Sequence, residues 1–441
     1  MRLLGSCAII KKVKNHQTLT PLFCHSCLMN AFGILFLVAV ACTAILRFWL
    51  GVRHLAHVGA NRAAVPAEFT HQISLEAHQR AADYTCAKTR LALTSTALEI
   101  ALLLALTFGG GLQWLHDVSA AMFPAGLQRG LALIVLLGLV MMLVELPFSL
   151  YGTFRVEARF GFNKMTPALF WKDFFKGLAL AAILGLPLTA VMLWLMDKSG
   201  AYWWLYAWLT WMGFNILLLA IYPVWIAPLF NKFTPLENAV LKQRIEQLLT
   251  RCGFKVKGLM VMDGSLRSSH GNAYFTGFGN SRRIVFFDTL LERLSPPEVE
   301  AVLAHELGHF KRRHVIKRMV WTFAASFLFL WLLGFLLDQP WFYRGLNVST
   351  PSPAMALILF FMVIPNFTFL LSPLFAMYSR KHEFEADQYA AQNASAIDLI
   401  SALVKLYKDN ASTLTPDPLH SMFYDSHPPA LTRIGRLQAQ A

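Results

Sequence analysis

The sequence predicts a mainly α-helical, polytopic membrane protein that carries a smaller soluble α+β part. Of its 441 residues, 56% are hydrophobic and only 15% are charged, whereas a soluble globular chain carries about 25% charged residues. Seven apolar runs are each roughly 20 residues or longer, which is enough for a helix to cross the ~30 Å hydrocarbon core of a bilayer. Two polar blocks, 231–314 and 379–441, lie outside these runs.

The first 30 residues differ from the rest of the chain, because they are polar and basic. We expect residues 1–30 to form an N-terminal extension that either lacks fixed structure or is not translated, with Met29 as the true start.

Five apolar runs follow one another and form the predicted N-terminal transmembrane domain, residues 31–230. Two further spans lie between the polar blocks, within residues 315–378. Pro365 and Pro373 interrupt the last span, because a proline inside a helix removes a backbone hydrogen bond. In chain order the seven predicted spans are 31–50, 92–115, 129–152, 175–196, 202–225, 315–337 and 354–378.

Lysine and arginine are distributed unevenly among the predicted loops. The segments 51–91 and 153–176 carry five each, whereas 116–128 carries none and 338–353 carries only Arg344. The positive-inside rule therefore places the basic loops, and with them both polar blocks, in the cytoplasm. We expect a multi-pass protein of a bacterial inner membrane, or of the endoplasmic reticulum membrane in a eukaryote, with its active site on the cytoplasmic side.

This orientation and the net charge have two consequences. Seven spans require the N-terminus to lie outside the cytoplasm, where Lys11, Lys12 and Lys14 are unfavourable, and this favours a start at Met29. The formal net charge of +14 indicates contact with anionic lipid, so we expect the bilayer as a partner. No nucleic-acid-binding motif accompanies the charge, so we expect no nucleic-acid partner.

The first polar block has an α+β pattern. We expect an amphipathic helix over 236–252, a strand over 256–262 and a polar turn over 263–271. Alternation of apolar residues then predicts two paired strands, 272–278 and 283–287, joined by a Gly-Asn-Ser turn.

A further helix is predicted at the end of this block. Ser295, Pro296 and Glu298 are typical of an N-cap, a first helical residue and a capping box. Gly308 costs such a helix about 1 kcal/mol relative to alanine, so we expect a packing reason for it. We expect the helix to run on past Arg313 into the following span.

This helix carries a candidate metal site. His305 and His309 are four residues apart, so their side chains lie on one helical face. Two neutral imidazoles at this spacing can bind one Zn²⁺, and Glu306 can take a proton from a zinc-bound water. Taken alone, the motif also fits a buried helix whose histidines bond to their neighbours.

A third ligand is expected where the last span leaves the membrane. Glu383 and Asp387 are four residues apart and share a helical face, whereas Glu385 points away from it. One of the pair can bind zinc while the other accepts a hydrogen bond from a ligand histidine and fixes its tautomer. Without the histidine motif, the same residues would read as a solvated charge run.

His270 and His314 are not included in the predicted ligand set. On a continuous helix, His314 would lie about 140° round the axis from His309. Glu99 and Glu145 lie in predicted spans, where a carboxylate must pair or line water.

Together these residues resemble the type 1 CAAX prenyl protease family, which are integral-membrane zinc metallopeptidases of the gluzincin type. The resemblance covers nearly the whole chain beyond residue 30. Its signatures here are HELGH at 305–309, EFEAD at 383–387, Glu157–Lys164, Ile226–Lys232, Gly271–Tyr274, and Ser426–Pro429 with Arg433.

The resemblance implies a fold and a ligand set. It implies a barrel of seven transmembrane helices around a water-filled chamber, with the zinc site at its cytoplasmic end. The family's first glutamate in ExxxD binds the metal, which selects Glu383 as the third ligand and leaves Asp387 as the partner of a histidine. One Zn²⁺ per chain is implied, held by a metalloprotease domain formed by 231–314 and 379–441.

The remaining roles combine chemistry with the resemblance. Peptide hydrolysis builds a tetrahedral oxyanion that needs a donor beyond the metal, and His427 is the candidate, with Arg433 as a further cation or a structural clamp. Asn272, Ala273 and Tyr274 would form an edge strand that binds an extended substrate by strand addition. The alternatives are a plain surface histidine and a plain sheet strand.

The predicted function is a zinc-dependent membrane endopeptidase in which a metal-activated water hydrolyses a peptide bond. The resemblance implies substrates with C-terminal CAAX-type sequences, and membrane proteins are the other candidate, so the partner is a peptide or protein that is prenylated or membrane-embedded. The second interpretation is a channel, transporter or scaffold with a structural metal site. A structural zinc site usually has four protein ligands, whereas three leave one position open.

Overall fold

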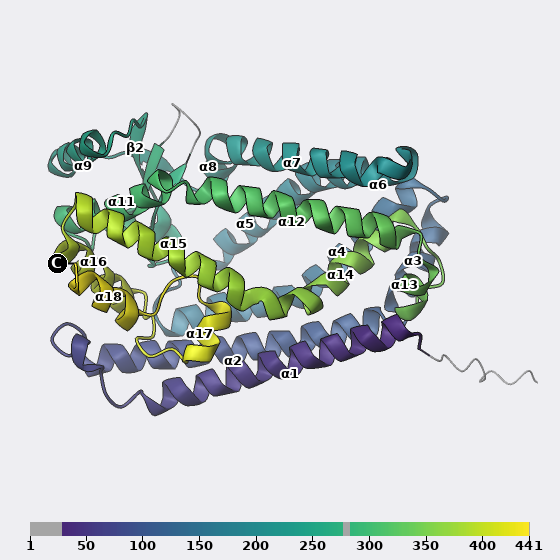
Figure 1. Cartoon of the computed structure of the whole chain (residues 1–441), viewed down its shortest axis with the longest axis horizontal. Coiled ribbons are helices and arrows are strands. Elements are labelled where there is room, and N and C mark those ends of the chain that lie inside the picture. The colour runs from purple at the N-terminus through teal and green to yellow at the C-terminus, as the bar shows by residue number, and fades with distance from the viewer. Residues whose placement is uncertain (1–28, 277–282, 441) are drawn as a thin grey trace, which may run out of the picture.

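The structure, a computed structural model, describes residues 29–276 and 283–440. The predicted N-terminal extension up to residue 28 and the Gly-Asn-Ser turn at 279–281 lie outside the described residues. Long helices run side by side along the longest axis of the molecule (Figure 1). At one end they meet the small sheet and four further helices: α9 (Ala239–Cys252), α11 (Pro296–Lys311), α16 (Ala396–Asp409) and α18 (Ala430–Gln438).

Seven helical segments among the described residues are long and apolar enough to cross a membrane, and each overlaps one predicted span. Three of them contain a π-helical turn and two contain a 3₁₀ turn, the fifth segment beginning with η4 (Gly200–Tyr202). In order they are α1 (Ala31–Ala60); α2 (Leu75–Leu106); α4 (Leu127–Tyr151) with η2 (Gly152–Glu157); α5 (Pro167–Leu180), η3 (Ala181–Gly185) and α6 (Leu186–Lys198); α7 (Trp203–Ile221), η5 (Tyr222–Ile226) and α8 (Ala227–Phe230); α12 (His314–Leu337); and α14 (Pro353–Thr368), η8 (Phe369–Leu371) and α15 (Ser372–Asn393).

The C-terminal end predicted for the second span, 92–115, is wrong. Helix α2 ends at Leu106, and a separate helix, α3 (Gly111–Met122), follows. Three consecutive glycines separate them, and Gly110 has a left-handed backbone with a φ of 75°. Glycine adopts this conformation without strain, and a helix readily ends there.

The two prolines do not end the last span. Pro365 lies inside α14, and Pro373 occupies the first turn of α15, where its missing N–H leaves no helical bond unmade. The chain therefore passes from the apolar region into the stretch that carries Glu383 on a single helix, α15.

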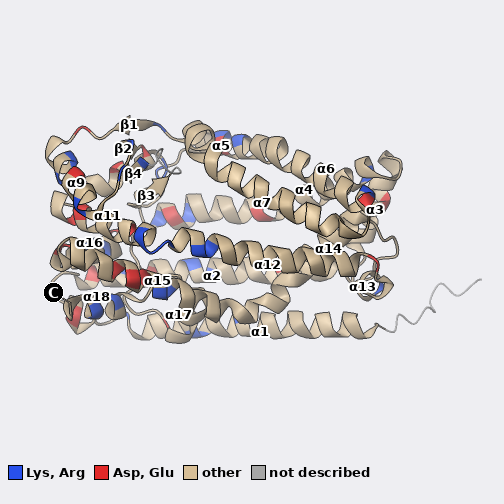
Figure 2. Ribbon diagram, turned by 45° about the horizontal axis from the view of Figure 1, so that its top comes forward, with Lys and Arg blue, Asp and Glu red and all other residues tan. Residues whose placement is uncertain are grey.

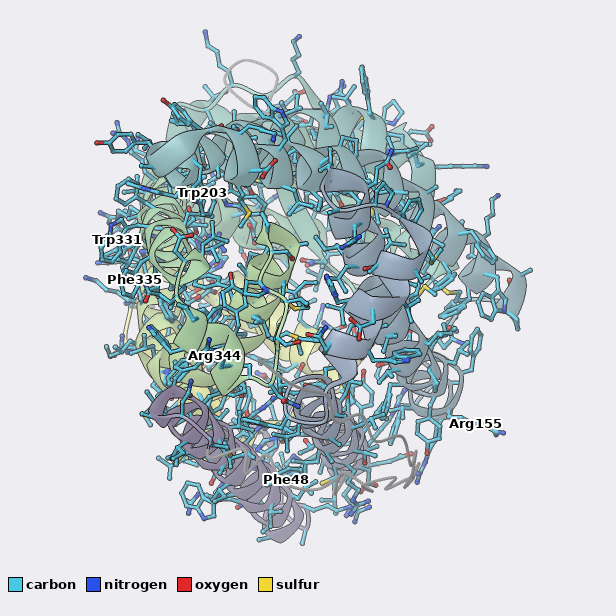
Figure 3. The ribbon with its side chains drawn as sticks, turned by 90° about the vertical axis from the view of Figure 1, so that its right-hand side faces the viewer. Phe48, Arg155, Trp203, Trp331, Phe335 and Arg344 are labelled. Atoms are coloured by element: carbon cyan, nitrogen blue, oxygen red, sulfur yellow. The ribbon has the colours of Figure 1, made fainter. Side chains whose placement is uncertain are left out.

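The seven spans form a ring, which Figure 3 shows end-on. Most of these spans bury few side chains: only 6% of the most apolar window is buried in Leu127–Glu157 and in Gly200–Phe230, and 11% in Leu75–Leu106, although 39% is buried in Pro353–Asn393. A helix packed against a solid core would bury a stripe at least ~100° wide, or more than about a quarter of its residues. The ring is therefore a barrel in which the spans other than the last are not packed against a solid core.

The barrel is closed at the end opposite the sheet. There α3 and α13 (Pro340–Gly345) pack against the ends of the spans in one buried apolar cluster. The fully buried side chains of this cluster include Phe36, Leu112, Leu133, Phe342 and Tyr343.

Charged residues gather mainly at the end that carries the sheet, around the sheet and helices α9, α15 and α18 (Figure 2).

The sheet has four strands in the order β1-β2-β4-β3. They are β1 (Phe233–Pro235), β2 (Gly258–Met262), β3 (Ala273–Thr276) and β4 (Arg283–Phe287). The predicted pairing of the last two is confirmed, with Tyr274 opposite Val285, and β3 lies at the edge of the sheet. The other short elements are η1 (Ala67–Phe69), η4 (Gly200–Tyr202), η6 (Gly264–Leu266), α10 (Asp288–Leu291) and α17 (Pro418–Tyr424).

Helix α11 begins with the predicted capping box. The backbone N–H of Ser295 donates to the Glu298 carboxylate at 2.7 Å. Ser401 and Lys405 of α16 donate to the same carboxylate at 2.7 and 2.8 Å. The N-terminus of α11 is therefore tied to the helix that packs against it.

The prediction that this helix continues into the next span is wrong. Helix α11 ends at Lys311, and α12 begins at His314. Between them Arg313 has a left-handed backbone with a φ of 56°, and its N–H bonds back to the carbonyl of Phe310 at 3.0 Å. The chain changes direction here, which alters where His314 lies.

Gly308 lies where α11 crosses α15. A Cβ added to it would be 2.9 Å from the Cα and 3.0 Å from the carbonyl oxygen of Ala386. Both contacts are to backbone, which cannot move aside as a flexible side chain can. The expected packing reason for this glycine is therefore the close approach of two helices.

Replacing Gly308 with alanine is expected to destabilise the protein by about 1–3 kcal/mol, because α11 and α15 must separate. The matched control is Gly435→Ala in α18, where an added Cβ would meet no described atom within 4 Å. The control should be neutral or stabilising by up to about 1 kcal/mol. Thermal unfolding in detergent measures both, and equal midpoints would contradict the close packing.

Candidate metal centre

Helices α11 and α15 bring the three predicted ligands together. The Nε2 atoms of His305 and His309 are 3.2 Å apart. Oε2 of Glu383 lies 3.5 Å from His305 Nε2, and its Oε1 lies 3.4 Å from His309 Nε2. Among the described residues, these form the one group of three such side chains whose ligand atoms all lie within 4.8 Å of one another.

The spacing of these atoms fits a tetrahedral metal ion. Ligands at 2.0–2.1 Å in a tetrahedron are about 3.3 Å apart, and the separations here are 3.2, 3.5 and 3.4 Å. Oε2 of Glu383 is buried and has no hydrogen-bond partner among the described residues. A cation between the three groups would satisfy this oxygen and both nitrogens.

A carboxylate and an arginine hold His305 on the Nδ1 side of its ring. Oδ1 of Asp387 lies 2.8 Å from His305 Nδ1, so this ring nitrogen can donate its proton there and leave Nε2 free as a ligand. Arg433 donates to both oxygens of Asp387, at 2.8 and 2.7 Å, and is buried with it. The role of Asp387 expected from its spacing therefore agrees with its position, and Arg433 is a clamp on it.

The pKa values of the two ligand histidines shift in opposite directions. Burial and Arg433 lower the pKa of His305, but its hydrogen bonds with Asp387 and Glu383 outweigh them and raise it to about 9. Burial, together with the charge of His305, lowers the pKa of His309 to about 3. His309 is thus a neutral imidazole, which is the form that binds metal.

His309 also has a partner behind it, which the sequence did not reveal. Its Nδ1 lies 2.9 Å from Nδ1 of His314, and Nε2 of His314 lies 2.9 Å from Oε2 of Glu385. His314 is buried, with 2% of its surface exposed. It is not a member of the ligand group, as expected, but the left-handed turn at Arg313 places it against a ligand.

Glu306 and His427 complete the centre. Glu306 follows the first ligand on α11, and burial, followed by the nearby Glu383 carboxylate, raises its pKa above that of a free glutamate. Nε2 of His427 lies 3.5 Å from Oε1 of Glu383, and 64% of its side chain is exposed. His427 also lines a cavity of about 350 Å³ that extends towards α1, through His54, and α2, through Thr85.

The edge strand lies close to the metal helix. Phe275 of β3 packs on Phe310 at the end of α11, with ring centroids 4.8 Å apart. The backbone carbonyl of Asn272 accepts the last hydrogen bond from β4, from the N–H of Phe287 at 2.9 Å. Ala273 and Tyr274 follow it in β3. The predicted substrate strand is thus positioned beside the ligand helix.

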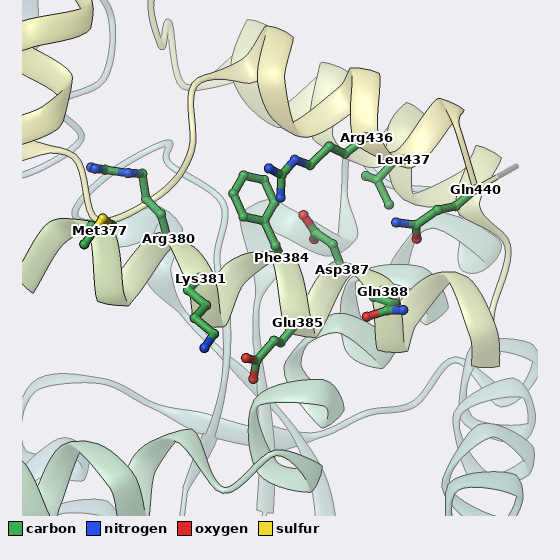
Figure 4. A pocket seen from close by; sticks show the side chains of 10 residues that line it. All are labelled: Met377, Arg380, Lys381, Phe384, Glu385, Asp387, Gln388, Arg436, Leu437 and Gln440. Atoms are coloured by element: carbon green, nitrogen blue, oxygen red, sulfur yellow. The ribbon is translucent and has the colours of Figure 1, made fainter.

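A larger cavity, of about 490 Å³, lies between α15 and α18 (Figure 4). Arg436 points onto the ring of Phe384, 3.8 Å from its centroid. Asp387 and Glu385, the partners of His305 and His314, line it, and none of the three ligands does. This cavity is therefore separate from the ligand atoms.

Family models match the chain over nearly all of its described length. Residues 54–232 match the CAAX prenyl protease N-terminal domain with five membrane helices. Residues 235–441 match peptidase family M48.

Individual relatives agree with this. A CAAX prenyl protease 1 homolog of Arabidopsis thaliana is 35% identical over 384 residues, covering 85% of this chain and 91% of its own. CAAX prenyl protease 1 of Saccharomyces cerevisiae is 39% identical over 330 residues, covering 70% of this chain and 72% of its own. The crystal structure of S. mikatae Ste24p superposes with a TM-score of 0.87 at 30% identity, covering 92% of this chain and 99% of that one.

These matches confirm the predicted fold class and the resemblance, and they do not favour a transporter or scaffold. The chain is a multi-pass membrane metallopeptidase that belongs to peptidase family M48, with the N-terminal membrane domain of the CAAX prenyl proteases.

Proposed function

We propose that the metal is one Zn²⁺ per chain, held by His305, His309 and Glu383, and that the protein is a zinc-dependent endopeptidase. The observation that carries the proposal is the spacing of the two imidazole nitrogens from each other and from the two oxygens of Glu383, at 3.2–3.5 Å, which is close to that of tetrahedral ligands. Two imidazoles and one carboxylate are the ligand set of catalytic zinc sites, in which a fourth position stays open.

The residues around the metal have separate tasks. When bound, the zinc would lower the pKa of a water and polarise the substrate carbonyl. Glu306 accepts the proton of the attacking water, and its raised pKa improves it as a base. His427 lies beside Glu383 and lines the smaller cavity. From there it donates a hydrogen bond to the developing oxyanion. Asp387 and Arg433 hold the tautomer of His305.

We propose that the substrate binds in extended form along β3. This edge strand has β4 on one side only, so its outer edge can accept a peptide by strand addition. Asn272, Ala273 and Tyr274 would supply the backbone hydrogen bonds. Since the relatives are named CAAX prenyl proteases, the proposed substrates are C-terminal CAAX-type peptides, prenylated or not, and membrane-embedded proteins are the second candidate.

We propose that the metal centre faces the cytoplasm. The loops at the sheet end of the barrel are the lysine- and arginine-rich ones, and Figure 2 shows the charged residues gathered mainly at that end. The positive-inside rule places such loops in the cytoplasm. This orientation is tested by placing single cysteines near Arg62 and near Trp114. The measurement is which of the two a cysteine reagent reaches from each side of the intact membrane.

Replacing Glu306 with glutamine is expected to leave zinc bound and to lower peptide cleavage by about 10³-fold or more, because the amide cannot accept the proton. Metal analysis and a fluorogenic peptide assay measure the two effects. The matched control, Glu246→Gln on the exposed face of α9, should change neither. Undiminished cleavage by the Glu306 variant would end the proposal.

Replacing His314 with phenylalanine is expected to weaken metal affinity by about 10- to 100-fold, because His309 loses the partner on its second nitrogen. The matched control is His382→Phe. His382 stacks on His314, with ring centroids 3.9 Å apart, and phenylalanine keeps this stack. Retained metal is measured after dialysis against graded chelator. Equal retention by both variants would show that His314 does not support the ligand.

Substrate class is tested with matched peptides. A farnesylated peptide ending in a CAAX sequence, its unprenylated form and a peptide with a charged C-terminal sequence are incubated with the purified protein. Cleavage of the first two, absent with Glu306→Gln, is expected, and mass spectrometry locates the cut bond. Membrane proteins that Glu306→Gln traps in native membranes serve as the second set of substrates. If the wild-type protein cleaves fragments of these proteins and none of the CAAX peptides, the CAAX assignment is wrong.

A further inference from the structure

Two signature segments of the chain take no part in the metal centre. They are Glu157–Lys164, which follows α4, and Ile226–Lys232, which follows α7. Both meet the same turn of the soluble part, residues 263–271. This turn leads directly into Asn272 and the edge strand β3.

The first segment pairs with the turn through backbone hydrogen bonds. The N–H of Ser269 donates to the carbonyl of Phe162 at 3.1 Å, and the N–H of Lys164 donates to the carbonyl of Arg267 at 3.1 Å. Asn163 and Ser268 form an isolated β-bridge between these bonds. The turn is thus held by a short strand-like pairing to the end of a membrane helix.

The second segment holds the turn through side chains. Arg267 donates to both oxygens of Asp173, at 2.8 and 3.2 Å, and to Asn231 at 3.1 Å. The N–H of Lys232 donates to the carboxylate of Asp263 at 2.8 Å. Three parts of the membrane domain therefore hold this turn: the α4 extension (Glu157–Lys164), Asp173 of α5, and the α7 extension (Ile226–Lys232).

His270, two residues before the strand, joins these membrane contacts to the peptidase part. Its Nε2 lies 3.6 Å from Oε2 of Glu157, and its ring stacks on Phe162 at 4.4 Å. Its Nδ1 lies 3.1 Å from Oδ1 of Asn410 at the end of α16. The side chain of Thr289 donates to its backbone carbonyl at 2.9 Å.

Glu157 is itself held in place from the membrane side. The hydroxyl of Tyr84, on α2, donates to Oε1 of Glu157 at 2.6 Å. Tyr84 is buried, with 4% of its surface exposed, and its ring contacts Phe162 at 4.9 Å. The contact between Glu157 and His270 is therefore built from α2, the α4 extension and the turn together.

We propose that Glu157 and His270 are positioning residues that fix the edge strand, and with it the bound substrate, relative to the metal centre. This inference rests on the proposed binding of substrate to β3. Because strand pairing sets where a peptide lies along the strand, a small movement of β3 displaces the scissile bond from the ligands. The membrane barrel would thus control substrate binding through this turn.

The two nitrogens of His270 can be tested separately. His270→Asn keeps a polar group near the Nδ1 position and loses the reach to Glu157, whereas His270→Gln keeps a donor near the Nε2 position. Glu157→Gln removes the charge but keeps an acceptor for Tyr84. The matched control for charge is Glu76→Gln, on the exposed start of α2.

Kinetics on a peptide that the wild-type protein cleaves give the readout. For Glu157→Gln and His270→Asn we expect KM to rise about tenfold, the size of one lost polar contact to a charged group, with kcat and metal content nearly unchanged. His270→Gln should restore most of the wild-type KM, and Glu76→Gln should not differ from wild type.

A second series links the effect to the strand. In a series of peptides, a different backbone nitrogen is methylated in each, so that each peptide lacks one hydrogen-bond donor. The methylation that raises KM most with the wild-type protein should change KM little with Glu157→Gln. The inference would be overturned if KM were unchanged in Glu157→Gln and His270→Asn, or if His270→Gln had the same KM as His270→Asn. It would also be overturned if the effects of peptide methylation and of Glu157→Gln on KM were additive. A wild-type protein that cleaves no peptide would instead overturn the proposed function.

Discussion

The metal centre depends on how closely two helices approach at one glycine. At Gly308 the backbone of α11 lies against the backbone of α15, where a methyl group would come within 2.9 Å of the Cα of Ala386. Only at that distance do the short carboxylate of Glu383 and the imidazoles of His305 and His309 reach one another. The cost of a glycine inside a helix, about 1 kcal/mol, is offset by the packing it allows.

The membrane helices are part of this centre and not merely its anchor. Helix α15, which supplies Glu383 and Asp387, is the end of the last span. Helix α12, which begins the sixth span, supplies His314 behind His309. The turn that precedes the edge strand is held by the α4 and α7 extensions. The proposed ligand, its support and the proposed substrate strand are therefore all positioned by the barrel.

Much of this was predictable from the sequence, because periodic signals extend over many residues. Hydrophobic runs located all seven spans, and i, i+4 spacing placed His305, His309, Glu383 and Asp387 on facing sides of two helices. Strand alternation gave the pairing of β3 with β4, although β1, three residues long, left no such pattern.

The errors arose where a single backbone conformation decides the path. The left-handed residues Gly110 and Arg313 lie in the breaks after α2 and α11, where each is the N-cap of the next helix, and arginine gives no sign of this conformation. Assuming a continuous helix put His314 on the wrong side of the axis. The sequence nevertheless contained an indication of this contact, because Glu385 lies in the EFEAD motif and had no assigned role. In the structure Glu385 is the hydrogen-bond partner of His314.

The charges of the buried centre explain why Arg433 lies so close to a metal site. Burying unpaired charge is costly, so the groups must balance. The carboxylates of Glu306, Glu383 and Asp387 carry three negative charges, and Arg433, 6% exposed, carries one positive charge. The remaining two negative charges match the charge of one divalent cation. The positive charge of Arg433 lowers the pKa of His305, whereas the hydrogen bonds of His305 with Asp387 and Glu383 raise it. The arginine therefore opposes the protonation of His305 that the two carboxylates favour, and a metal ion bound to Nε2 would displace that proton.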